Sequence, residues 1–267
     1  MTSIKYMQHA ELMAWRKNLR RELLARRQAV PADRLQAWRL AMDRHLQYGF
    51  PGLAKGVVAF CWPIQNEYDA RHLMHRLRQQ GATAALPVVL APKTPLIFRE
   101  WHPGVELEVG KLDIPYPKAG AELVPNTVLL PMNGFDEQGY RLGYGGGFFD
   151  RTLEALKNRR PAVIGVAFEL AAIETVHPQP WDMPVDYVVT ERGIYRRNDG
   201  QRNDGKLEFL GVPQPPSATA LSSPVCYAAE IAPGYFGDDP AGAKPSRRPD
   251  RPRNTPARFR LRNTPAN

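Results

Sequence analysis

A glycine-rich segment between Arg141 and Asp150 contains the residue types that phosphate binding needs. Four of the five residues from 143 to 147 are glycines. Glycines allow backbone N–H groups to turn toward an anion, and a helix that starts after them adds a favourable dipole. An arginine can bind a phosphate through two parallel hydrogen bonds, and an aspartate can bind a divalent cation that bridges phosphates. The segment therefore predicts a phosphate-binding loop.

Two common nucleotide-binding patterns do not fit this segment. The sequence contains no G-x-x-x-x-G-K-[ST] pattern, and the third glycine of a dinucleotide fingerprint would fall at Asp150. The alternative is that the glycines serve only to form a tight turn. A strand expected before the segment and a helix expected after it, together with Arg141 and Asp150, favour phosphate binding over that alternative.

The elements around the loop indicate an α/β protein with a mostly parallel sheet. Apolar residues at three- and four-residue spacing predict helices over 11–30, 32–48, 69–81 and 148–159. Short apolar runs predict strands over 56–62, 83–89, 96–101, 126–132, 162–168 and 186–190. Such a sheet places ligand sites at the carboxyl ends of its strands.

Bulk composition is that of an ordinary globular chain. The 267 residues are 43% hydrophobic and 24% charged, and no apolar run approaches the length that spans a bilayer. The N-terminus lacks the apolar centre of a signal peptide. Cys61 and Cys226 form neither a disulfide framework nor a metal-ligand pattern. We expect a cytoplasmic protein that does not enter a membrane.

The C-terminal part of the sequence has a different character. It contains the repeats RNDG and RNTPA, each twice, and is rich in proline. Eight Lys or Arg residues against Asp250 give the segment from Ala241 onward a charge of +7, out of +9 for the whole chain. We therefore predict a folded domain over 1–197 and a disordered tail over 198–267. A nucleic-acid partner is expected only through this tail.

The glycine-rich segment and its surroundings resemble one enzyme family. "PMNGFDEQGYRLGYGGGFFDRTL" is similar to the signature of the 5-formyltetrahydrofolate cyclo-ligases, also called methenyltetrahydrofolate synthetases. "WRKNLRREL" resembles the family's basic N-terminal helix, "WPIQNEYD" its strand-end segment with a glutamate, and "WDMPVDYVVT" its late aspartate segment. The resemblance extends from about Trp15 to Tyr195 and does not include the tail.

The resemblance implies both a fold and an activity. The fold would be a three-layer α/β/α domain like those of the ribose-5-phosphate isomerase and CoA-transferase group. The activity would be ATP- and Mg2+-dependent conversion of 5-formyltetrahydrofolate, with or without a polyglutamate chain, to 5,10-methenyltetrahydrofolate, with release of ADP and phosphate. ATP would phosphorylate the formyl oxygen, and N10 would then attack the activated carbon. We expect a monomer.

The resemblance also assigns roles to individual residues on the ATP side. Arg141 and Asp150 are expected to be catalytic, Asp150 and Asp186 to bind the metal, and Asp182 is the competitor of Asp186 for that role. Arg16 stands where the family has a lysine, so Lys17 could compensate for it beside Arg20. The expected ATP-binding residues are Arg16, Lys17, Arg20, Arg141, Leu142, Gly143, Tyr144, Gly145, Gly146, Gly147, Phe148 and Phe149.

On the folate side the resemblance points to three residues. Glu67 would accept hydrogen bonds from the pterin ring, Trp62 would line the site, and Phe148 would stack on the substrate. Trp62 could equally be a core residue. The family usually has tyrosine at Phe148, and some members have lysine at Gly146, so part of the phosphate charge must be met elsewhere. Two alternatives to the enzyme remain: a nucleic-acid-binding protein that uses the tail, or an α/β relative that binds a phosphorylated ligand without turnover.

Overall fold

The computed structural model describes residues 8–110, 113–198 and 205–215. Its α-helices and 3-10 turns are, in chain order, α1 (His9–Gln28), α2 (Ala32–Gly49), η1 (Pro51–Lys55), α3 (Arg71–Gln79), α4 (Phe148–Leu156) and η3 (Glu169–Ala171). The strands are β1 (Val57–Ala59), β2 (Thr83–Val88), β3 (Ile97–Trp101), β4 (Leu107–Val109), β5 (Pro115–Pro117), β6 (Thr127–Pro131), β7 (Gly134–Phe135), β8 (Arg141–Leu142), β9 (Ala162–Val166), β10 (Tyr187–Thr190), β11 (Gly193–Arg197) and β12 (Leu207–Gly211). All helices and strands predicted from the sequence are confirmed. Within these ranges no helix is long and apolar enough to cross a membrane.

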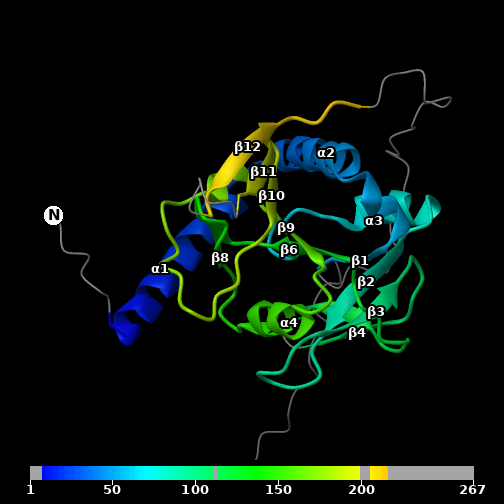
Figure 1. Ribbon diagram of the computed structural model, residues 1–267, viewed down its shortest axis with the longest axis horizontal. Helices are drawn as coiled ribbons and strands as arrows, with labels where there is room; N and C mark the ends of the chain where they lie inside the picture. Colours follow the sequence, from blue (N-terminus) through cyan, green and yellow to red (C-terminus); the bar gives the residue numbers. More distant parts are fainter. Residues whose placement is uncertain (1–7, 111–112, 199–204, 216–267) are drawn as a thin grey trace, which may run out of the picture.

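One eight-stranded sheet forms the centre of the molecule (Figure 1). Its strands lie in the order β12-β11-β10-β9-β6-β1-β2-β3. The strands from β10 to β2 pair in parallel. The edges are antiparallel, with β3 on one side and β11 and β12 on the other. The predicted mostly parallel sheet is therefore confirmed.

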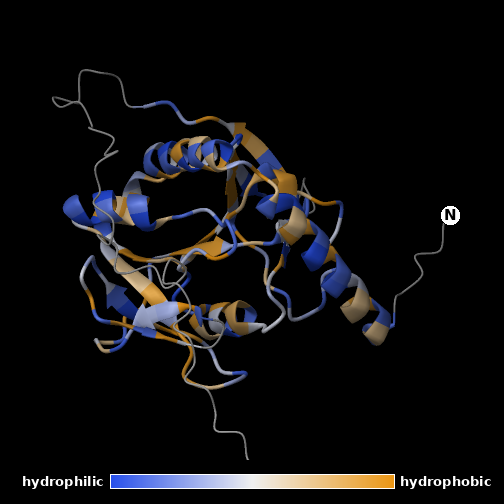
Figure 2. Ribbon diagram, turned by 180° about the vertical axis from the view of Figure 1, so that it is seen from behind, coloured by the Kyte–Doolittle hydropathy of each residue, from blue (hydrophilic) through white to orange (hydrophobic). Residues whose placement is uncertain are grey.

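Helices cover both faces of this sheet, which gives the predicted three layers. In Figure 1, α2 and α3 lie on one face, α4 lies on the other, and α1 runs along one side. Alternate residues of a buried strand point to opposite faces. Leu129 of β6 belongs to the core cluster that includes residues of α2 and α3. Its neighbours Val128 and Leu130 pack instead with Leu153 of α4. Figure 2 shows the resulting apolar strands between amphipathic helices.

The sheet extends beyond the domain boundary that the sequence predicts at residue 197. β12 pairs with β11, and the rings of Tyr195 and Phe209 lie 4.9 Å apart. The prediction of disorder is therefore wrong for Leu207–Gly211, where a short apolar run forms an edge strand after the repeats. Residues 199–204 and 216–267, which make up most of the predicted tail, lie outside the described residues.

Candidate functional site

A small hairpin, formed by β7 and β8, leads into the glycine-rich segment. Asp136 stabilises its turn, because Oδ1 accepts hydrogen bonds from the backbone N–H groups of Gln138 and Tyr140 at 3.1 and 3.0 Å. Its Oδ2 accepts another from the N–H of Val176 at 3.0 Å. The hairpin ends with Arg141 and Leu142, so Asp136 has a structural role in placing the start of the loop.

Two positions in the loop have backbone angles that favour glycine. Gly145 has a φ of 92° and Gly147 a φ of 62°, both in the left-handed region. Gly147 directly precedes α4, whose first turn contains Asp150. The strand, glycine-rich loop and helix therefore follow one another as the sequence predicts, and the loop meets the positive end of a helix dipole.

Arg141, which precedes the loop, and Asp150, which follows it, form an ion pair. Arg141 Nη2 donates to Asp150 Oδ1 at 2.7 Å, and Nη1 donates to the backbone oxygen of Met183. The backbone N–H of Met183 donates to the same Asp150 oxygen at 3.2 Å. The Arg141 side chain is only 5% exposed, whereas that of Asp150 is 25% exposed. Burial lowers the pKa of Arg141, and the Asp150 carboxylate opposes this shift.

The basic helix α1 reaches the same region through Arg16 and Arg20. Arg16 Nη2 forms an ion pair with Asp182 Oδ2 at 2.6 Å, and the Asp182 charge also acts on Arg141. Arg20 Nε donates to the backbone oxygen of Gly143 at 2.6 Å. Burial lowers the pKa of Arg20, and the neighbouring charge of Arg16 lowers it further.

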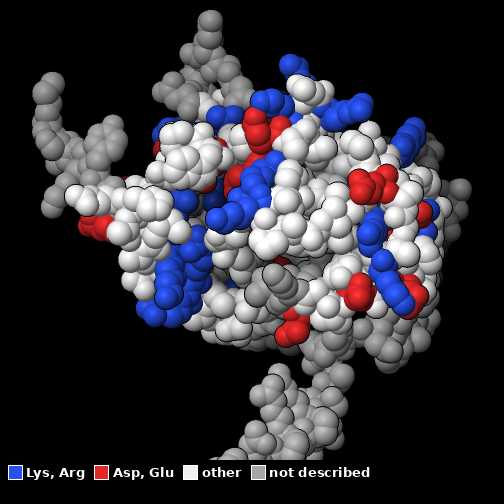
Figure 3. Space-filling view, turned by 90° about the horizontal axis from the view of Figure 1, so that it is seen from below, with Lys and Arg blue, Asp and Glu red and all other residues white. Residues whose placement is uncertain are grey.

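Lys17 is exposed on the same helix. Figure 3 shows Lys and Arg side chains gathered on the side of the molecule where α1 lies. The helix therefore presents a set of positive charges beside the glycine-rich loop.

Asp186 occupies a different place from Asp150. It directly precedes β10, and its Oδ2 accepts a hydrogen bond from the backbone N–H of Val163 in β9 at 2.7 Å. Its carboxylate is thus engaged at the amino ends of β9 and β10. Besides Asp150, the charge of Asp182 raises the pKa of Arg141. Among the described residues there is no group of three or more His, Cys, Asp or Glu side chains that could hold a metal ion. A metal role for Asp186 stays a prediction.

Glu67 is a buried carboxylate in the second half of the site, the half to which the sequence assigns folate. Its side chain is 4% exposed. Oε2 accepts a hydrogen bond from the backbone N–H of Ile64 at 3.1 Å, and Oε1 accepts one from the hydroxyl of Tyr144 at 2.6 Å. Burial raises the pKa of Glu67, whereas the Tyr144 hydrogen bond and the charge of Arg27 lower it. Glu67 therefore contacts the glycine-rich loop directly.

Sequence reasoning missed Arg27, which connects α1 to both partners of this contact. Its Nη2 donates to the Tyr144 hydroxyl at 3.1 Å and lies 3.9 Å from Glu67 Oε1. Its Nε donates to the backbone oxygen of Gln65 at 2.9 Å. A signal was available, because Arg27 follows Arg20 by seven residues and so lies on the same face of the helix.

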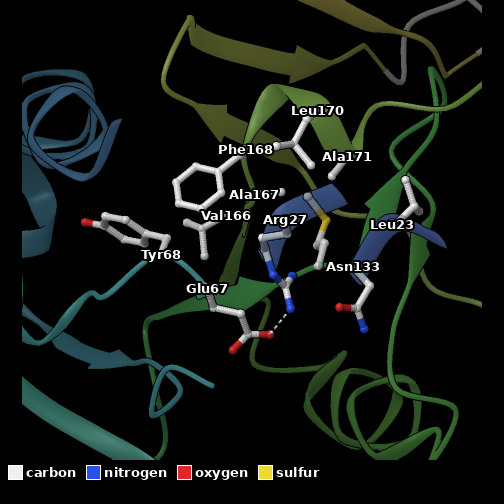
Figure 4. A pocket seen from close by; sticks show the side chains of 11 residues that line it. Leu23, Arg27, Glu67, Tyr68, Asn133, Val166, Ala167, Phe168, Leu170 and Ala171 are labelled. Carbon is white, nitrogen blue, oxygen red and sulfur yellow. Dashed lines mark ion pairs between the residues drawn. The ribbon is translucent and has the colours of Figure 1, made fainter. Parts of the chain in front are cut away.

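A small cavity lies beside Glu67, where β6 and β9 end (Figure 4). Its volume is about 10 Å³, which is room for roughly one water molecule. The lining is mostly apolar, with Met132, Val166 and Phe168 among its members. Its polar and charged side chains include those of Arg27, Glu67 and Asn133. The cavity lies at the carboxyl ends of parallel strands, where such sheets bind ligands.

Trp62 does not line this cavity. It is 3% exposed and belongs to the main core cluster. The guanidinium of Arg71 lies 4.5 Å from the centre of its ring. The structure therefore gives Trp62 the core position that the sequence left open as its second interpretation.

The remaining loop residues pack around the start of α4. The guanidinium of Arg151 lies over the Phe148 ring at 5.4 Å. A Cβ atom at Gly146 would approach that ring to 2.9 Å, so the present arrangement has no room for a side chain there. Leu142 and Phe149 contact two different apolar clusters beneath the loop.

Comparison with known proteins agrees with this architecture. The profile of the 5-formyltetrahydrofolate cyclo-ligase family matches residues 12–191. A 5-formyltetrahydrofolate cyclo-ligase of Escherichia coli K12 is 31% identical over 177 residues, which cover 64% of this chain and 96% of that protein. One of Mycolicibacterium smegmatis is 30% identical over 191 residues, which cover 67% of this chain and 95% of that protein.

Solved structures give the same result. The 5,10-methenyltetrahydrofolate synthetase of Aquifex aeolicus superposes with a TM-score of 0.61 at 27% identity, covering 70% of this chain and 95% of that one. A methenyltetrahydrofolate synthetase of Mycoplasma pneumoniae shares the fold with a TM-score of 0.54 at 22% identity, covering 66% of this chain and 98% of that one. The chain belongs to the 5-formyltetrahydrofolate cyclo-ligase family.

Proposed function

We propose that this chain converts 5-formyltetrahydrofolate to 5,10-methenyltetrahydrofolate at the expense of ATP, releasing ADP and phosphate. The observation that carries the proposal is the 2.6 Å hydrogen bond between Tyr144 and Glu67. It joins a glycine-rich loop suited to phosphates to a buried carboxylate suited to a pterin ring. Transfer of a phosphoryl group between two substrates requires their sites to be adjacent. The names of the relatives supply the identity of the substrate.

The chemistry explains why ATP is needed. The formyl oxygen of the substrate is amide-like and is a poor leaving group. Transfer of the γ-phosphoryl group to this oxygen forms a phosphate ester and releases ADP. N10 then attacks the activated carbon and loses its proton, the carbon–oxygen bond breaks, and the oxygen departs within inorganic phosphate. The protein contributes mainly positioning and charge neutralisation.

On the ATP side, the backbone N–H groups of the glycine-rich loop would contact the phosphates. Arg20 lies against Gly143 and Gly145 and is well placed to neutralise a phosphate bound in the loop. Arg141 would hold Asp150, and with it the start of α4, in position through their ion pair. Arg16 and Lys17 add positive charge along the same helix.

The residues present fit a magnesium ion that is completed by ATP. Mg2+ in such sites is held by one or two carboxylates together with substrate phosphates and water. Asp150 fits this role, because its carboxylate is partly exposed in the first turn of α4, next to the loop. A second carboxylate, if used, would come from Asp182 or Asp186. The ion would neutralise charge on the phosphates.

On the folate side, Glu67 would accept hydrogen bonds from the N–H groups of the pterin ring. The hydroxyl of Tyr144 now donates to Oε1, so a substrate N–H group would compete with it for this oxygen. The cavity of about 10 Å³ must also widen to admit a ring. Movement of Tyr144 away from Glu67 would free Oε1 and would move the phosphate loop with it. A cytoplasmic location, a monomeric state and acceptance of polyglutamylated folate stay predictions from the sequence.

The proposal is tested with purified protein, 5-formyltetrahydrofolate, ATP and Mg2+, by following the absorbance of the methenyl product. We expect product only when all three are present. Folded protein that binds ATP without forming product would instead indicate a relative that only binds phosphorylated ligands. Circular dichroism of the same sample establishes that the protein is folded.

A further inference from the structure

Asn133 is a buried amide that faces the cavity beside Glu67. It follows β6, is 4% exposed, and lines the cavity. Its backbone N–H donates to the backbone oxygen of Leu142 at 3.0 Å. Its side-chain Oδ1, however, is buried and has no hydrogen-bond partner among the residues that the structure describes. In Figure 4 this oxygen is on the side that faces Arg27 and Glu67.

An unpartnered buried amide oxygen is unusual and needs a reason. The large majority of buried polar side-chain atoms in native proteins have a hydrogen-bond partner, because leaving one without a partner is unfavourable. Asn126, just before β6, has a partner even though it is exposed. Its Oδ1 accepts a hydrogen bond from the backbone N–H of Val57 at 2.8 Å. The two asparagines flank the same strand, and only the one at the cavity lacks a partner for its oxygen.

We propose that Asn133 Oδ1 accepts a hydrogen bond from a ring N–H group of the bound folate, and so recognises the pterin together with Glu67. The inference rests on the proposed function, because it takes the cavity to be the folate pocket. A reduced pterin offers a 2-amino group, N3–H and N8–H as donors on different edges, so a carboxylate that faces the 2-amino group and N3–H does not also reach N8–H. Asn133 adds a neutral acceptor on the same cavity, so the ligand supplies the donor that the free protein lacks.

A contact between Asn133 and folate predicts that one substitution changes stability and folate binding in opposite directions. A leucine has nearly the shape of an asparagine but no polar atoms. Replacing an unpartnered buried polar group by an apolar group of the same shape is nearly neutral or stabilising. Asn133→Leu should therefore leave the free protein at least as stable as the wild type while weakening the binding of folate. A purely structural asparagine would not separate the two properties in this way.

The experiment measures the Tm of the free protein and the Kd for 5-formyltetrahydrofolate in the absence of ATP. For Asn133→Leu we expect an unchanged or higher Tm and a Kd raised about 3- to 10-fold, which is the loss of one neutral hydrogen bond. KM for folate should rise by a similar factor, with kcat changed less. The matched control is Asn126→Leu. It removes a satisfied hydrogen bond, so its Tm should fall by a few degrees while the Kd stays that of the wild type.

Two results would overturn the inference. If Asn133→Leu binds folate as tightly as the wild type, the amide oxygen does not contact the substrate. If its Tm falls together with its affinity, Asn133 has a structural role instead. Failure of the wild-type protein to bind 5-formyltetrahydrofolate is a separate outcome, because it would reject the proposed function itself and the inference with it.

Discussion

Glu67 combines burial with two occupied oxygens, and this governs how it can act on a substrate. Only the ionised carboxylate can accept two hydrogen bonds from a pterin edge. Burial disfavours that form, while the hydroxyl of Tyr144 and the charge of Arg27 support it. The ionisation of Glu67 is thus set jointly by the cavity and by the glycine-rich loop.

We predict an acidic limb in the pH profile of folate binding. Because burial raises the pKa of Glu67, KM for folate should rise on acidification at a pH above the ordinary range of a glutamate. Glu67→Gln should bind folate more weakly and lose this limb. Tyr144→Phe removes a hydrogen bond that lowers the pKa of Glu67, so its limb should move to higher pH. Tyr116→Phe, which removes an exposed hydroxyl bonded to Glu108, is the matched control. An identical limb in wild type and Glu67→Gln would contradict the assignment.

Asp150 is best tested by a substitution that keeps its hydrogen bonds. Asp150→Ala would leave the buried Arg141 without its counter-ion, and such a change often destabilises a fold by about 3–5 kcal/mol. Asp150→Asn can still accept from Arg141 and Met183 but has no charge for a metal ion. We expect kcat to fall about 100-fold or more, with the Mg2+ requirement shifted to higher concentration.

The control for this variant is Glu154→Gln, an exposed position on the same helix that pairs with Lys157. It should keep wild-type turnover. Wild-type turnover and Mg2+ dependence in Asp150→Asn would remove Asp150 from the metal site.

At the scale of elements, α1 holds both halves of the site with one face. Arg20 contacts the loop at Gly143, and Arg27 contacts Tyr144 and Glu67 two turns later. The hairpin of β7 and β8 fixes the start of the loop, and α4 follows its end. The glycine-rich segment is therefore held by a helix far from it in sequence, and its position depends on how that helix packs.

We expect Arg20→Ala to weaken ATP binding selectively. Loss of a half-buried cation beside the phosphates should raise KM for ATP about 10-fold, while the Kd for folate changes little. Arg21→Ala is the matched control, since Arg21 is an exposed neighbour that bonds only Asn18 among the contacts described for it. Equal effects of the two substitutions on KM for ATP would show that general positive charge, rather than the position of Arg20, matters.

Periodicity and motif spacing predicted the four α-helices and six strands of the central sheet, but not its last two strands, the small hairpins or the contacts between elements. The parallel strands were recognisable because their apolar runs are short and bounded by turn residues. Arg27 was missed because it is one of six arginines from Arg16 to Arg34, and helical spacing alone does not show which of those on one face turn inward. The contact of Tyr144 with Glu67 joins residues 77 positions apart, a relation that one sequence does not contain.

At the scale of the whole molecule, the folded body includes an edge strand that composition concealed. β12 follows repeats of turn-forming residues, so its short apolar run was predicted to belong to the tail. The ring contact between Tyr195 and Phe209 and the pairing with β11 attach it to the sheet. Low-complexity sequence therefore lies both before the last strand, in the RNDG repeats, and after it.

Two truncations separate the last strand from the basic tail. A chain that ends at Pro215 retains β12 and should keep the wild-type Tm and turnover, measured by thermal unfolding and by formation of the methenyl product. It should lose salt-sensitive retention on RNA, because the +7 segment has been removed. A chain that ends at Asp199 also lacks β12, so we expect its Tm to fall by several degrees. Equal Tm values for the two truncations would contradict a stabilising role for β12.

The fate of the formyl oxygen tests the central claim most directly. The substrate is prepared with 18O in the formyl group and converted with ATP and Mg2+ by the full-length protein, and the released phosphate is analysed by mass spectrometry. Phosphorylation of that oxygen predicts one 18O atom in each inorganic phosphate, with one ADP formed for each methenyl product. Methenyl product accompanied by unlabelled phosphate, or formed without consumption of ATP, would contradict the proposed reaction.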